Sequence, residues 1–326
     1  MKNIKILLVS IVSILCICFI AEFTAYKLES HRLVKEGYRF VNDANKPPYP
    51  KNIEMFSSDF EKKNKCEILD DKKGLNYKKN SILVFGDIYA KSLDLSNDNN
   101  LTAKLSDLTK RPVYNFASAG WGIQHMYYLL KNEEYLSCVK NPDTIIFVYS
   151  GDMKNRLASF SFYPHHTFLN LKYKLSDGVL VEQVPKALFA YNSYFVRVME
   201  RLNGIKKSKS KNPQIQQKNF ELIKILFEQS RRVANVRYPD VKKFIIFRYV
   251  NPWDSMRTLS DEEGYAISQL EYNMWKKLQE EGFTVIDITE LSDNNYNDGN
   301  HLDEMNSPTE ETLDELLPLL VEKADL

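Results

Sequence analysis

Four short apolar runs, separated by helical patterns, restrict this 326-residue chain to a narrow class of folds. The runs are residues 81–85 (SILVF), 144–149 (TIIFVY), 243–249 (KFIIFRY) and 283–288 (FTVIDI). Apolar runs of this length without polar alternation are typical of strands buried on both faces of a sheet. Strands that alternate with helices form a mainly parallel sheet covered on both faces. The sequence therefore predicts a three-layer α/β/α sandwich.

The segments between these runs predict the helices and one further strand. Residues 112–115 have the pattern of a short strand, and residues 157–213 interrupt the alternation with an aromatic-rich stretch that holds few clear helices. We expect this stretch to form an insertion over the carboxyl edge of the sheet. Apolar residues at helical spacing predict helices over residues 101–108, 123–130, 214–236, 261–281 and 309–323.

The first segment of the chain is much more apolar than the rest. Residues 6–21 are apolar except for two serines, which is typical of a secretory signal or of a slightly short membrane anchor. Cleavage after Ala21 or Ala25 is disfavoured, because a phenylalanine would occupy the position that requires a small side chain. We therefore predict one uncleaved N-terminal transmembrane helix, with the rest of the chain extracytoplasmic. Basic residues flank both ends, so the charge pattern does not decide the orientation.

These patterns divide the chain into three parts. We expect a membrane anchor over residues 1–26, a polar stalk over residues 27–76, which contains the run PPYP, and a folded domain over residues 77–326. The domain includes the insertion at about residues 157–213. We find no internal repeat.

The composition narrows the classes of partner and cofactor. The 44 basic and 43 acidic side chains give a net charge of +1, which provides no field to attract nucleic acid. No cysteine or histidine cluster has the spacing of metal ligands, so we expect neither a metal nor another cofactor. Two of the four cysteines lie in the anchor; Cys66 and Cys138 either form a disulfide in an exported domain or are two unrelated buried thiols.

Function is expected in the loops that follow the strands, because open parallel sheets bind ligands at the carboxyl ends of their strands. Four loops stand at these places. They contain residues 86–88 (GDI), 115–122 (NFASAGWG), 150–156 (SGDMKNR) and 298–301 (DGNH).

In this order and spacing, the four loops resemble the sequence blocks of the SGNH hydrolases, the GDSL esterase/lipase superfamily, over roughly residues 77–320. The resemblance implies a flavodoxin-like sheet and an ester hydrolase site. It also implies that His301 is the catalytic base, that Asp298 orients it, and that Gly120 contributes a backbone N–H to the oxyanion hole. Two positions depart from the family pattern: Ile88 stands where the nucleophilic serine is expected, and Asp152 where an asparagine is expected.

Both departures oppose covalent hydrolysis. The reaction needs a hydroxyl beside an imidazole, and isoleucine has no atom that can attack a carbonyl. The oxyanion hole needs donors, whereas an ionised Asp152 would repel the developing negative charge; loss of one donor alone costs about 3–4 kcal/mol. Replacement hydroxyls are conceivable at Tyr89, Ser92 and Ser118, and so is attack by a water that His301 activates.

Other loop residues are assigned by type and place. Asp87 and Trp121 join Gly120 and Asp152 as candidates for oxyanion or ligand binding. Trp121 either stacks on a sugar face or packs in the core. His125 is expected to support the site from behind or to lie on the surface.

The sequence therefore predicts a membrane-anchored, SGNH hydrolase-like protein that is catalytically impaired or inactive and binds a cell-surface glycan or an acyl ester. One alternative is an active esterase of the carboxylesterase or acetylesterase class, which acts on cell-envelope polysaccharide through another nucleophile or through water. A second alternative is a scaffold without enzymatic function, whose contacts come from the insertion.

Overall fold

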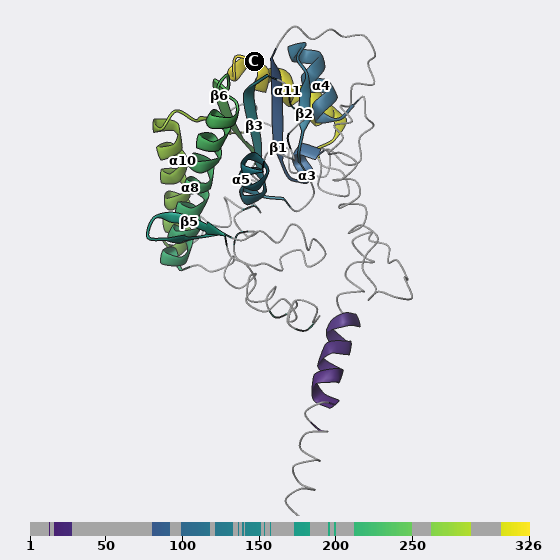
Figure 1. Cartoon of the computed structure of the whole chain (residues 1–326), viewed down its shortest axis with the longest axis vertical. Helices are drawn as coiled ribbons and strands as arrows, with labels where there is room; N and C mark the ends of the chain where they lie inside the picture. The colour runs from purple at the N-terminus through teal and green to yellow at the C-terminus, as the bar shows by residue number, and fades with distance from the viewer. Residues whose placement is uncertain are drawn as a thin grey trace, which may run out of the picture.

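The computed structural model describes most of the domain and part of the N-terminal segment (Figure 1). Residues 16–27 form a helix, and the described part of the domain begins at residue 80. The described residues are 13, 16–27, 80–91, 99–117, 121–132, 136, 139, 141–150, 153, 157, 173–182, 195, 199, 212–249, 262–287 and 308–326.

A five-stranded sheet forms the centre of the domain, and all its strands are parallel. The strand order is β2-β1-β3-β6-β7. This arrangement confirms the predicted parallel sheet and has the order of a flavodoxin-like fold. The strands are β1 (Ser81–Gly86), β2 (Val113–Asn115), β3 (Pro142–Ser150), β6 (Lys243–Tyr249) and β7 (Thr284–Asp287).

Helices cover both faces of the sheet, as the sequence predicts (Figure 1). One core lies under three helices and includes Phe147 and Phe227; the other lies under two helices and includes Ile146 and Leu316. Successive residues of β3 enter opposite cores, which explains why this strand is apolar throughout. The first layer contains α5 (Ile123–Lys131), α8 (Pro213–Arg237) and α10 (Glu262–Glu280), and the second contains α4 (Leu101–Thr109) and α11 (Glu310–Lys323).

The helices begin where the sequence provides capping residues. The Asn100 side chain accepts a hydrogen bond from the backbone N–H of Ala103 and starts α4. Asn212 caps α8 in the same way and is followed by Pro213 at the first helical position. Thr309 caps α11 through the N–H of Thr312. The three capped helices begin within about one or two residues of their predicted starts.

A hairpin within residues 157–213 is a feature that the sequence analysis did not predict. Strands β4 (Tyr173–Ser176) and β5 (Val179–Glu182) pair antiparallel around Asp177 and Gly178, whose φ angles are 51° and 75°. Positive φ at both central residues is the geometry of a two-residue hairpin turn, for which Asp-Gly is a preferred sequence. Asp-Gly between short alternating segments is the signal that would have identified it.

The inner face of this hairpin packs on the domain. The Tyr173 ring meets Tyr127 of α5 edge-on, with ring centroids 5.3 Å apart, and the Tyr173 hydroxyl lies 3.4 Å from Oε2 of Glu182. Burial and the neighbouring carboxylate raise the pKa of both tyrosines. Figure 1 shows the hairpin near the carboxyl ends of the strands, beside α8.

The predicted anchor is only partly within the described residues. Residues 16–27 are helical, and the remainder of the predicted anchor and the predicted stalk after Lys27 lie outside them. Among the residues that the structure describes, no helix has both the length and the hydropathy needed to cross a bilayer.

The end of β1 depends on a glycine. Gly86 has a φ of 151°, and a Cβ placed on it would lie 2.8 Å from the carbonyl oxygen of Val148 and 2.9 Å from Cβ of Ala90. A side chain here would strain the backbone and push β1 away from β3 or from the helix that follows.

We predict that Gly86→Ala lowers the free energy of unfolding by about 3 kcal/mol, because it combines backbone strain with a clash between packed elements. Urea denaturation measures this change. Gly178→Ala is the matched control, since Gly178 also has a positive φ but has open space around it; the expected cost there is about 1 kcal/mol. Equal losses at the two positions would contradict the proposed clash.

Candidate functional site

The strand order places the candidate site at the carboxyl ends of β1 and β3. From β1 the chain crosses one face of the sheet through α4 to reach β2, and then the other face through α5 to reach β3. The chain leaves β1 towards α4 on one face and leaves β3 towards α8 on the other, so the connections from these two neighbouring strands diverge at their carboxyl ends. This is the point where such sheets bind ligands. Three of the four loops identified from the sequence begin at β1, β2 and β3.

Asp87, directly after β1, is completely buried and makes two hydrogen bonds through its carboxylate. Its Oδ1 accepts from the backbone N–H of Tyr89 at 3.0 Å, and its Oδ2 accepts from the hydroxyl of Ser150 at 2.6 Å. The first bond supports the start of α3 (Ile88–Lys91), and the second joins the ends of β1 and β3. These contacts give Asp87 a structural role; its part in ligand binding stays a prediction.

Ile88 is the first residue of α3 and follows the buried Asp87 directly. The backbone therefore has the strand, tight turn and helix that present a residue at the edge of the sheet. The next side chain, Tyr89, packs against the core beneath α4 and α11, with its ring 4.8 Å from the ring of Tyr249. One side of the Tyr89 ring is therefore packed against this core.

Asn115, the last residue of β2, is a site residue that the sequence analysis did not single out. Its side-chain amide donates to the carbonyl of Ala90 at 2.8 Å and to the hydroxyl of Thr102 at 2.9 Å. Its Oδ1 accepts from the N–H of Ala117 at 2.9 Å. Asn115 therefore connects β2, α3 and α4, and it holds the start of the glycine-containing loop. An asparagine at the end of a predicted strand, at the head of this loop, was the available signal.

Trp121 and His125 form a stacked pair at the start of α5. Trp121 is 4% exposed and belongs to the core, and its ring lies 5.4 Å from the imidazole at an interplanar angle of 8°. Of the two predicted alternatives for Trp121, stacking on a sugar or packing in the core, the structure shows packing in the core. His125 is buried as well, and its Nδ1 accepts a hydrogen bond from the N–H of Gly122 at 2.9 Å. The imidazole thus satisfies a backbone donor at the helix start.

The end of the last strand is held by a cluster of charges. Nη1 of Arg248 on β6 lies 2.7 Å from Oδ2 of Asp287 on β7, and its guanidinium carbon is 4.9 Å from the ring centroid of Trp275. Glu271 on α10 accepts from the indole N–H of Trp275 at 3.3 Å and lies 3.7 Å from Arg248. The cluster fixes the position from which the chain leaves the sheet towards residues 298–301.

The other predicted site residues lie outside the described residues. They are Gly120, Asp152, Asp298 and His301, together with the alternative hydroxyls Ser92 and Ser118. The same holds for Cys66 and Cys138. Their assigned roles remain predictions. Within the part of the chain that the structure describes, no group of histidine, cysteine, aspartate and glutamate side chains could hold a metal ion.

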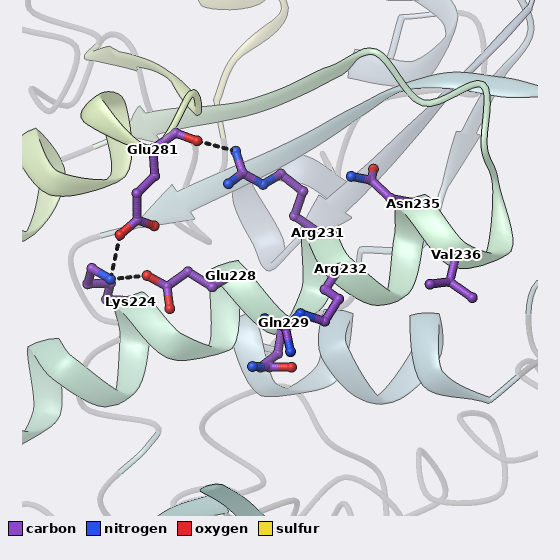
Figure 2. Close-up of a pocket in the computed structure, with 8 residues that line it drawn as sticks. All are labelled: Lys224, Glu228, Gln229, Arg231, Arg232, Asn235, Val236 and Glu281. Atoms are coloured by element: carbon purple, nitrogen blue, oxygen red, sulfur yellow. Dashed lines mark hydrogen bonds and ion pairs between the residues drawn. The ribbon is translucent and has the colours of Figure 1, made fainter. Parts of the chain in front are cut away.

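A surface hollow of about 800 Å³ is lined by residues of α8 and by Glu281, which directly follows α10 (Figure 2). Its charges are largely engaged with one another: Lys224 pairs with Glu228 and, at 2.7 Å, with Glu281. Arg231 donates to the carbonyl of Glu281 and lies 3.9 Å from the ring centroid of Phe283. This network stabilises the contact between α8 and the turn after α10, and we do not assign a ligand to it.

Comparisons with known proteins give a fold-level similarity. No protein-family model matches the chain, and no curated protein matches its sequence. Among solved structures, it is similar to a lipase from goat rumen metagenome, with a TM-score of 0.43, 12% identity and coverage of 75% of this chain and 97% of that one. It is also similar to a member of the lipolytic protein G-D-S-L family from Veillonella parvula (TM-score 0.39, 11% identity, 75% and 97% covered). A GDSL-like lipase from Bacteroides thetaiotaomicron gives a TM-score of 0.39, 10% identity and coverage of 84% and 97%.

We predict that Asp87 and Ser150 stabilise the domain jointly. In a double-mutant cycle with Asp87→Ala and Ser150→Ala, the coupling in unfolding free energy is expected to be about 1–2 kcal/mol, because the two side chains share one buried hydrogen bond. Ser106→Ala is the control partner, since its hydroxyl bonds to the carbonyl of Arg111 elsewhere in the fold. Asp87→Ala and Ser106→Ala should add within about 0.5 kcal/mol. Additivity of the Asp87 and Ser150 changes would refute the link between β1 and β3.

Proposed function

We propose that this chain is a membrane-anchored, SGNH hydrolase-like protein that binds a cell-surface glycan or an acyl ester and does not cleave it through a covalent intermediate. The observation that supports this most is the residue at the start of α3. That position follows β1, the neighbour of the central strand β3, where the connections from these two strands diverge, and it holds Ile88.

The chemistry at this position argues against acyl transfer. A nucleophile must donate a lone pair to the carbonyl carbon while a base removes its proton, and isoleucine offers neither a lone pair nor an acidic proton. Tyr89, the adjacent hydroxyl, is partly buried, and its ring packs against the core beneath α4 and α11. Asp152, if ionised as assigned, would add negative charge where an oxyanion must develop. Without a nucleophile at residue 88 no oxyanion forms, and without a donor at residue 152 an oxyanion would not be stabilised. The two changes therefore both oppose covalent hydrolysis.

The scaffold around this position argues for a retained binding edge. The buried hydrogen bond between Asp87 and Ser150 holds the ends of β1 and β3 together, and Asn115 holds the end of β2 to α3 and α4. Arg248 and Asp287 do the same for β6 and β7. Ordered strand ends without a nucleophile suit recognition of a ligand better than its turnover.

We predict that the full-length protein hydrolyses p-nitrophenyl acetate no faster than its His301→Ala variant, because no residue forms the acyl-enzyme. Restoring the family pattern with Ile88→Ser and Asp152→Asn should produce turnover that depends on His301. Release of p-nitrophenol, followed by absorbance, measures both. His301→Ala in the restored protein is the matched control.

Turnover by the natural sequence that His301→Ala abolishes would overturn the proposal and favour an active esterase. The ligand itself is tested on an array of O-acetylated and de-acetylated oligosaccharides. Binding of the natural protein to a subset of these is the expected result. The absence of any retained glycan or acyl ester would favour the scaffold alternative.

A further inference from the structure

The C-terminal end of the helix of residues 16–27 has features that are typical of a membrane–water boundary. Its apolar side chains Ile17, Phe19 and Phe23 are exposed, although exposure to water is unfavourable for such large groups. The ammonium of Lys27 lies 5.6 Å from the ring centroid of Phe23. Aromatic rings and lysines gather at the headgroup level of a bilayer, so the boundary falls at about residues 23–27.

A hydrogen bond joins this boundary to residues 157–213. The carboxylate of Glu22 accepts from the backbone N–H of Phe195 at 3.1 Å. A carboxylate is costly in hydrocarbon and is therefore expected at the headgroup level. The backbone of Phe195 must then lie at the same level. Ala25, one turn further along the helix, is buried, which is consistent with packing at this end.

Exposed apolar side chains occur next to this contact. Phe195 and Met199 are both about half-exposed. Large apolar groups presented together at the headgroup level are the pattern of a segment that lies on a bilayer.

The outer face of the β4–β5 hairpin has the same character. Val179 and Val181 are exposed, and Lys174 is exposed directly across the ladder from Val181. The inner face, with Tyr173, packs on the domain instead. Apolar side chains with a lysine among them suit an anionic lipid surface, because the lysine stem can lie on the apolar layer while its charge stays in water. In Figure 1 the hairpin and the helix of residues 16–27 both lie on the side of the sheet to which the carboxyl ends of the strands point, the hairpin beside α8 and the helix further from the sheet.

We propose that this end of the domain lies on the bilayer, with Phe195, Met199 and the two hairpin valines in contact with lipid. This inference rests on the proposed membrane anchor. Its consequence is that the carboxyl edge of the sheet faces the membrane surface. The ligand class of the candidate site is then an amphiphile held in that surface, such as a lipid-linked glycan or a long-chain acyl ester, rather than a freely diffusing sugar.

The contact is tested by photo-crosslinking of the full-length protein in vesicles of phosphatidylcholine and phosphatidylglycerol. Two variants carry the photoreactive group at the proposed contact: Phe195→p-benzoylphenylalanine and Val179→p-benzoylphenylalanine. Their matched controls are Tyr272 on α10, which is 61% exposed against 44% for Phe195, and Val236 on α8, which is 80% exposed against 62% for Val179. Mass spectrometry identifies lipid adducts, and flotation of the vesicles reports membrane attachment.

Lipid adducts at residues 179 and 195, with none above background at 236 and 272, are the expected result. Attached protein with no lipid adduct at 179 and 195, or with equal adducts at all four positions, would overturn the inference and leave the anchor intact. Crosslinks to a protein at 179 and 195 would assign the surface to a protein partner and also overturn it. Protein that does not float with the vesicles would overturn the anchor and, with it, this inference.

Discussion

The close pairing of β1 with β3 at their carboxyl ends is the constraint on which the rest of the edge depends. Gly86 lets the backbone of β1 come within contact distance of Val148, and Asp87 then accepts a hydrogen bond from Ser150. The same carboxylate supports the first turn of α3. One buried acidic residue thus sets both the spacing of two strands and the direction of the helix that begins at Ile88.

The sheet is predictable from the sequence because its signal is local. Residues 145–149 and 244–247 are apolar on both strand faces, and only a sheet covered by two layers buries such runs completely. The β4–β5 hairpin was missed because one of its faces is exposed, so its apolar residues are few and its Asp177–Gly178 turn lies in a stretch without regular pattern. Local turn chemistry, rather than hydrophobicity, carries that signal.

The site is less predictable, because its contacts join residues that are far apart in the chain. The packed state of Trp121 and the role of His125 depend on contacts among the residues at the start of α5, which no spacing rule describes. The pair Arg248 and Asp287 depends on the register between β6 and β7. The sequence located the loops correctly for β1, β2 and β3, and it named Asp87, but not the partner that gives Asp87 its structural role.

The proposed function depends on Ile88 at the start of α3. Its side chain contains only carbon and hydrogen and therefore cannot bond covalently to an electrophile. The most direct test treats the full-length protein with a fluorophosphonate and locates phosphonylated residues by peptide mass spectrometry. We expect no adduct on the natural chain and an adduct at residue 88 in Ile88→Ser. A phosphonylated hydroxyl on the natural chain that disappears in His301→Ala would contradict it.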